Sequence, residues 1–151
     1  MFEKILVPLD GSARAEAILP QAESLALEFA SRLILLHVIE PGSSLMSPHG
    51  SHPEVSIELS RQKKDELERY LAGKKGEFRE KGIDVETVLA QGPVVETIIH
   101  TAAEYDVDLI AMASHGRTGL SRVFYGSVAA GVLHQVDRPL LLIRAADYAV
   151  S

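Results

Sequence analysis

One nearly unbroken apolar run constrains the fold of this chain more than any other feature. Arg32–Ile39 reads RLILLHVI, in which only His37 interrupts seven positions that are otherwise apolar. A strand that shows one face to water alternates apolar and polar residues, whereas apolar residues at consecutive positions require cover on both faces. Such strands belong to parallel sheets with helices on either side, so the run indicates an α/β architecture. We interpret His37 as a core residue with satisfied hydrogen bonds.

Similar strand patterns recur along the chain. Lys4–Leu9, Leu109–Ala113 and Leu140–Arg144 are short and mostly apolar, which predicts three more buried strands. Ile83–Ala90 alternates apolar and polar residues instead, and this is typical of a half-exposed strand at the edge of a sheet. The pattern therefore predicts five strands.

Helical patterns lie between these strands. The first runs from the Asp10-Gly11-Ser12 cluster to about Ser31, and Pro20 predicts a kink or a break within it. A long charged helix is expected over about 55–81, with Gly82 as its terminating residue. Two more helices are expected after Gly92-Pro93 and from Ser127 to about Val136. The buried face of the first helix is predicted to consist of Ile18, Ala22, Leu25, Ala26 and Phe29. That of the long charged helix is predicted to consist of Leu67, Leu71 and Phe78.

The alternation of five strands with four helices predicts a mainly parallel α/β sheet with helices on both faces. The 151 residues fit a single domain, 1–151. Three prolines and four serines over Glu40–Glu54 indicate a flexible loop (41–54), and residues 146–151 read as a tail. In such sheets, ligands bind beyond the carboxyl ends of the strands, where the strand order reverses.

Composition excludes several classes of function. The net charge is −6, so a domain-wide basic surface for nucleic acid is not expected. The chain has no cysteine, which excludes disulfides and thiolate metal sites. It contains no apolar run of about 20 residues for membrane insertion and no signal-peptide pattern, so we expect a cytoplasmic protein. His49 and His52 lack a third ligand at a known spacing, and we predict no metal site.

The stretch Leu109–Val128 carries the strongest functional signal. A buried strand leads through a glycine-containing loop to Gly126-Ser127, where a helix pattern begins. Glycines let a ligand approach the backbone, and free N–H groups at a helix start attract phosphate. A loop whose glycines serve only the turn is an equally good interpretation. His115, Arg117 and Arg122 could contact a ligand there or remain solvated.

Two residues near expected strand ends have both a structural and a functional interpretation. Asp10 could cap the following helix or accept hydrogen bonds from ribose hydroxyls. Ser127 could be an N-cap, a phosphate ligand, or both. The Walker motif, the dinucleotide fingerprint and the GxSxG elbow are all missing from the sequence, so it predicts a binding site more readily than a reaction.

Taken together, these motifs resemble the universal stress protein family over nearly the whole chain. The resemblance rests on KILVPLDGS, LLHVIEP and ASHGRTGLSRVFYGSVAAGVLHQVDRPLLLIR. The ATP-binding branch of that family carries G-x2-G-x9-G-[ST], which here begins at Ala113 and continues with Gly116, Gly126 and Ser127. Alanine thus stands where the family has its first glycine. The resemblance implies a Rossmann-like fold of the adenine nucleotide α-hydrolase type, with an open five-stranded sheet of order 3-2-1-4-5.

The resemblance also implies a site. Pro8, Leu9 and Asp10 would border adenine and ribose, with the Asp10 carboxylate on the sugar hydroxyls, and the backbone of Val38 would bind the adenine edge. The phosphates would lie against Gly126, Ser127 and Val128. The loop residues that would wrap ribose and phosphates are Ala113, Ser114, His115, Gly116, Arg117, Thr118 and Gly119.

The function that the resemblance implies is ATP binding (or AMP or ADP), with Mg2+ or Mn2+ brought by the nucleotide and at most slow hydrolysis. The protein would be a nucleotide-dependent sensor or regulator in stress response, and a homodimer through the Leu140–Ile143 strand. One alternative is a nucleotide-independent dimeric interaction protein of the same fold. The other is a true ATPase or nucleotidyl transferase.

Overall fold

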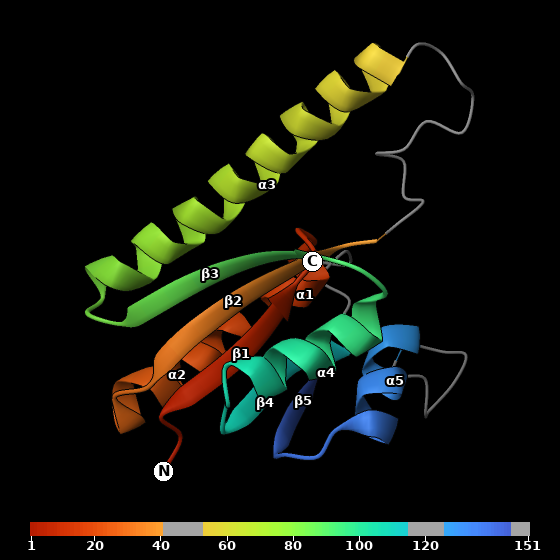
Figure 1. The fold of residues 1–151 in the computed structure, drawn as a ribbon. Helices are drawn as coiled ribbons and strands as arrows, with labels where there is room; N and C mark the ends of the chain where they lie inside the picture. Colours follow the sequence, from red (N-terminus) through yellow and green to blue (C-terminus); the bar gives the residue numbers. More distant parts are fainter. Residues whose placement is uncertain (41–52, 115–125, 146–151) are drawn as a thin grey trace.

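Five parallel strands and five helices form the computed structural model, which describes residues 1–40, 53–114 and 126–145 (Figure 1). The strands are β1 (Lys4–Leu9), β2 (Arg32–Ile39), β3 (Asp84–Gln91), β4 (Leu109–Ser114) and β5 (Leu140–Arg144). The helices are α1 (Ala13–Glu16), α2 (Leu19–Phe29), α3 (Pro53–Glu80), α4 (Val94–Glu104) and α5 (Ser127–Gln135).

The strand order is β3-β2-β1-β4-β5, and every neighbouring pair is parallel. The expected order 3-2-1-4-5 is therefore confirmed. β3 lies at one edge of the sheet, as its alternating pattern predicted, and β5 lies at the other. The chain proceeds outward from β1 through β2 to β3, and it then returns to the other side of β1 to form β4. The strand order thus reverses between β1 and β4.

Helices cover both faces of this sheet, and the two faces form two separate layers of core. Ile5, Val7 and Leu35 pack on one face against residues of α2 and α3. Leu6 and Leu36 pack on the other face against α4 and α5. All five of these side chains have no exposed surface, because consecutive apolar positions on β1 and β2 point to opposite, equally covered faces.

The first predicted helix is broken in two, as Pro20 indicated. α1 ends at Glu16, and Pro20 lies in the first turn of α2, where a missing N–H costs nothing. Ile18, Ala22 and Ala26 are buried, as predicted. The prediction for Phe29 is wrong, because this side chain is 38% exposed and packs at the surface, edge-on to the ring of Phe2.

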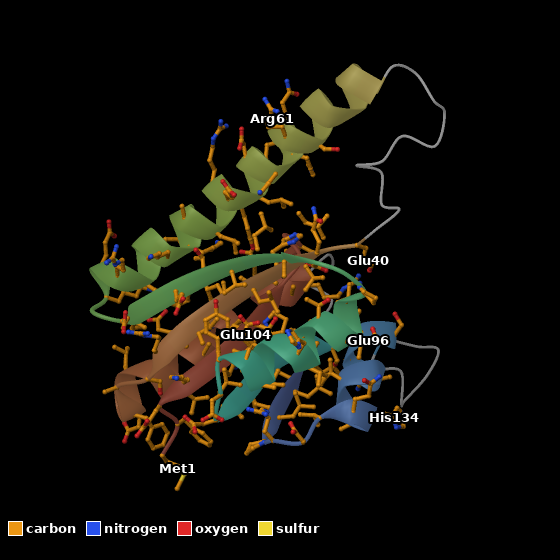
Figure 2. The ribbon with its side chains drawn as sticks, viewed as in Figure 1. Met1, Glu40, Arg61, Glu96, Glu104 and His134 are labelled. Atoms are coloured by element: carbon orange, nitrogen blue, oxygen red, sulfur yellow. The ribbon has the colours of Figure 1, made fainter. Side chains whose placement is uncertain are left out.

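Helix α3 is much longer than the strands it covers. Its 28 residues correspond to about 42 Å, against about 26 Å for the eight residues of β2. Its first turns therefore extend past the sheet (Figure 1), and Arg61 points away from it (Figure 2). Leu71 and Phe78 are buried as predicted, whereas Leu67 is only partly buried. Within the described ranges, no helix is both long and apolar enough to cross a membrane.

Glu16 connects the short helix α1 to α3. The Tyr70 hydroxyl donates to Glu16 Oε2 at 2.7 Å, and the Lys74 ammonium lies 2.9 Å from Oε1. Burial, followed by the hydrogen bond to Glu16, raises the pKa of Tyr70 well above its usual value, so this hydroxyl stays a donor. One carboxylate thus holds α1 in place at the carboxyl end of β1.

His37 is buried in the core as expected, with 9% of its surface exposed. The expectation that its hydrogen bonds are satisfied is wrong, since its Nδ1 has no partner among the described residues. Burial lowers the pKa of His37, and the negative charge and backbone carbonyl of Asp10 only partly oppose this shift. Burial therefore favours the neutral form of the imidazole.

Helices α4 and α5 approach each other closely at Gly131. A Cβ atom built at this position would lie 2.6 Å from Val95 Cγ2, closer than two carbon atoms can pack. Gly73 of α3 is also inside a helix, but a Cβ atom there would meet nothing within 4 Å. The two glycines therefore offer a matched pair that differs in packing.

Gly131→Ala should destabilise the protein, whereas Gly73→Ala should stabilise it. Replacing glycine by alanine inside a helix stabilises the helix by at most about 1 kcal/mol at either site, because alanine has the higher helix propensity. Overpacking at position 131 costs about 1–3 kcal/mol, which outweighs that gain. Urea unfolding of the three proteins measures both changes in the free energy of unfolding. Equal stabilisation by both substitutions would contradict the close contact.

The pH dependence of stability should reflect the buried His37. Because its native pKa is lowered, the unfolded chain binds a proton more readily, and stability should fall as pH drops below 6.5, the ordinary pKa of a histidine side chain. The stability is fully present above that pH. His37→Leu should remove this part of the decline when urea unfolding is followed from pH 8 to pH 5. Parallel stability curves for the two proteins would show that His37 contributes none of it.

Candidate functional site

A cavity of about 180 Å³ opens at the carboxyl ends of β1, β2 and β4, where the strand order reverses. This is the place where open α/β sheets bind ligands. The cavity is bounded by α1 on one side and by the first turns of α4 and α5 on the other. Its lining comprises Pro8, Leu9, Asp10, Ser12, Arg14, Ala15, Leu36, Val38, Glu40, Val94, Ile98, Met112, Ala113, Ser114, Val128 and Ala129.

The floor of the cavity is apolar. Leu36 and Ile98 are almost fully buried, and Met112 and Ala129 are 5% and 3% exposed. These four residues belong to the core layer between the sheet and helices α4 and α5. A floor of this kind favours an uncharged, largely apolar group over a charged one, because a charge placed there would lose its hydration.

Charged side chains lie around the mouth of the cavity. Asp10 follows β1 and Glu40 follows β2, both exposed, and Figure 2 shows Glu40 at the end of its strand. Arg14 brings a positive charge from α1. A ligand with an apolar ring and a polar, charged remainder would match this division between floor and mouth.

The carboxylate of Asp10 is held by hydrogen bonds from one residue. The backbone N–H of Ser12 donates to Oδ1 at 2.8 Å, and the Ser12 hydroxyl donates to the same oxygen at 2.5 Å. Gly11 lies between them with φ 85°, a conformation that glycine adopts without strain. Ser12, and not Asp10, is the N-cap of α1, because its Oγ accepts from Ala15 N–H at 3.1 Å. The capping interpretation of Asp10 is therefore wrong.

Helix α5 begins beside the cavity with the residues expected to receive phosphate. Gly126 is its N-cap, with φ 81°, and makes no side-chain cap. Ser127 is the first helical residue and is exposed, so the N-cap interpretation of this serine is wrong. The positive φ at position 126 moves the helix boundary onto the glycine. The first backbone N–H groups of α5 therefore receive no hydrogen bond from a side chain at position 126.

The structure brings seven of the predicted site residues together on one cavity. They are Pro8, Leu9, Asp10, Val38, Ala113, Ser114 and Val128. Gly126 and Ser127 precede Val128 but do not line the cavity themselves. The Ser114 hydroxyl donates to the carbonyl of Ile143 at 3.2 Å, so its side chain joins β4 to β5. His115, Gly116, Arg117, Thr118 and Gly119 lie outside the described residues.

Sequence reasoning missed several lining residues. Ser12 was predicted only as part of the Asp10-Gly11-Ser12 cluster at the start of the first helix, although a residue two positions after an aspartate is well placed to hydrogen-bond its carboxylate. Arg14 carried no motif. The floor residues Leu36, Ile98 and Met112 read simply as core, because periodicity does not distinguish a core residue from one that faces a cavity at a strand end.

The family model for the universal stress protein family matches residues 1–144. Universal stress protein MJ0577 of Methanocaldococcus jannaschii is 31% identical, covering 95% of this chain and 96% of that protein. Universal stress protein YxiE of Bacillus subtilis is 33% identical, covering 95% of this chain and all of that protein. The solved structure of MJ0577 superposes with a TM-score of 0.82, at 30% identity over 97% of this chain and 99% of that chain.

Two more distant solved structures share the fold. A universal stress protein of Archaeoglobus fulgidus in complex with dAMP has a TM-score of 0.63 at 20% identity, covering 95% of this chain and 98% of that one. A universal stress protein in complex with cAMP has the same TM-score at 18% identity, covering 96% and 98%. At these identities they show the fold alone. The match to the family model, by contrast, extends over nearly the whole sequence, and the chain therefore belongs to the universal stress protein family.

Proposed function

We propose that this universal stress protein binds ATP, or another adenine nucleotide, in the cavity at the ends of β1, β2 and β4. The observation that carries the proposal is the arrangement of the cavity. It combines an apolar floor, a fixed carboxylate at its mouth, and an adjoining helix start whose glycine N-cap supplies no side chain. Adenine, ribose and phosphate call for these three environments in that order. Adenine nucleotides are also the ligands of two distant members of the family.

Each part of the nucleotide has a counterpart among the residues of this chain. The adenine ring would lie on the apolar floor and bond to the backbone of Val38. The ribose would lie beside Asp10, whose carboxylate would accept hydrogen bonding from the sugar. The phosphates would receive hydrogen bonds from the amides at the start of α5 and from the Ser127 hydroxyl, and the helix dipole would favour their charge. Mg2+ or Mn2+ would arrive with the nucleotide.

The biological role that fits this site is nucleotide-dependent sensing or regulation in stress response, in the cytoplasm and with at most slow hydrolysis. Binding would change the segment between β4 and α5, which in the sequence leads directly into the proposed phosphate site. Measurement of phosphate release separates this role from that of a true ATPase, because a sensor or regulator should turn over bound ATP no more than slowly.

Asp10→Asn should weaken ATP binding about tenfold or more, because a hydrogen bond to a charged acceptor contributes about 1.5–3 kcal/mol. Calorimetric titration measures the dissociation constant directly. Asp65→Asn makes the same chemical change on the exposed face of α3, outside the cavity, and should leave binding unchanged. Absence of ATP binding to the wild-type protein at millimolar nucleotide would overturn the proposed function.

We further propose that the protein forms a homodimer through the edge of β5 that pairs with no other strand among the described residues, here called the free edge. This strand pairs with β4 on one side, and Leu140–Ile143 are only partly buried. Ile110 N–H donates to the carbonyl of Pro139, and Ala145 N–H donates to that of Ser114, so odd-numbered residues face β4. The N–H of Leu142 therefore points to the free edge, where a second copy could continue the sheet.

Leu142→Pro should convert the dimer to a monomer, because proline removes an N–H that points to the free edge and is not needed for the ladder with β4. Leu142→Val keeps the N–H and should remain dimeric. Sedimentation velocity measures the mass of each protein, and circular dichroism checks that the variants are folded. A monomeric wild-type protein, or a Leu142→Pro variant that stays dimeric, would contradict this interface.

A further inference from the structure

The carboxylate of Asp10 is engaged on one side only. Both donors from Ser12, the backbone N–H at 2.8 Å and the hydroxyl at 2.5 Å, reach Oδ1. An ionised carboxylate oxygen has two lone-pair directions, so these two bonds occupy Oδ1. Within residues 1–40, 53–114 and 126–145, the structure shows no donor on Oδ2. Oδ2 is therefore the carboxylate oxygen left to accept a hydrogen bond from a ligand in the cavity that Asp10 and Ser12 both line.

Ser12 is itself fixed, so the carboxylate has little freedom to turn. An ionised carboxylate only accepts, and the Ser12 hydroxyl proton must therefore point to Asp10. The same Oγ accepts the N–H of Ala15 at 3.1 Å, and the Ser12 carbonyl accepts the N–H of Glu16 at 3.2 Å. Glu16 is in turn bonded to Tyr70 of α3. The chain of contacts ties the orientation of Asp10 to the packed helices.

We propose that Ser12 is a positioning residue that restricts Asp10 to reading one sugar hydroxyl, through Oδ2. This inference rests on the proposed function, because it concerns how that site recognises a nucleotide. A carboxylate with two free oxygens can accept both neighbouring hydroxyls of a ribose, one on each oxygen. With Oδ1 occupied, the two hydroxyls compete for Oδ2, and they lie too close together to align with both of its lone pairs.

The consequence is an unequal response to the loss of the two ribose hydroxyls. The hydroxyl that donates to Oδ2 makes a charge-assisted bond, and its removal leaves the carboxylate without that donor. The other hydroxyl makes no strong bond to Asp10, so its removal should have little effect. The site should therefore tolerate one kind of deoxyribose and discriminate against the other.

The test compares binding of ATP, 2′-deoxy-ATP and 3′-deoxy-ATP by calorimetric titration. For the wild-type protein, one deoxy analogue should bind within about threefold of ATP, and the other should bind about tenfold or more weakly. Ser12→Ala frees one lone pair of Oδ1 and lets both oxygens take part. In this variant, the two analogues should bind within about threefold of each other.

Ser12→Thr keeps the hydroxyl and should restore the unequal response. Loss of the N-cap alone costs about 1 kcal/mol of stability, and it would change the affinities of all three nucleotides by the same factor. The ratio of the affinities for the two deoxy analogues, by contrast, depends on which oxygens of Asp10 can accept a hydrogen bond. Equal losses for the two analogues in the wild-type protein, or a ratio unchanged by Ser12→Ala, would overturn the inference while ATP still binds. Failure of all three nucleotides to bind would overturn the proposed function, and the inference with it.

Discussion

The burial of β1 and β2 on both faces is the constraint on which the rest of this structure depends. Ile5, Leu6, Val7 and residues 33–36 have no exposed surface, and no polar side chain interrupts them. Helices must therefore cover both faces, and polar groups of the central strands are displaced to the strand ends. The site follows from this constraint. Toward the carboxyl ends of these two strands, Asp10 and Glu40 are the first acidic residues after the buried segments.

The sequence predicted the fold well because the strongest signals were repeated and local. Consecutive apolar residues in Arg32–Ile39, alternation in Ile83–Ala90, and Pro20 inside a helical pattern each have one dominant structural consequence. The strand order came from the family resemblance, since periodicity says nothing about which strands are neighbours. Phe29 was misplaced because helical phase identifies the inner face but not the point where the helix passes the edge of the sheet.

The candidate site was predictable only in part, for a different physical reason. Asp10, Val38 and Ala113 were implied by the family resemblance, and they line one cavity because each lies at a strand end and parallel strands bring those ends to one edge. The role of Ser12 depends on the left-handed backbone at Gly11, and that of Gly126 on a positive φ at the start of α5. The unpartnered Nδ1 of His37 depends on the packing around it. These are properties of three-dimensional contact, which residue spacing does not encode.

The missing side chain at Gly131 has a consequence for how this site can change during evolution. Gly131 meets Val95, and the neighbouring residues Val94 and Ala129 form part of the cavity wall. The approach of α4 to α5 beside the cavity is therefore limited by Val95 and Gly131, neither of which lines the cavity. Paired changes at positions 95 and 131 offer a route by which descendants of this chain could admit a differently sized ligand while the residues in contact with it stay the same.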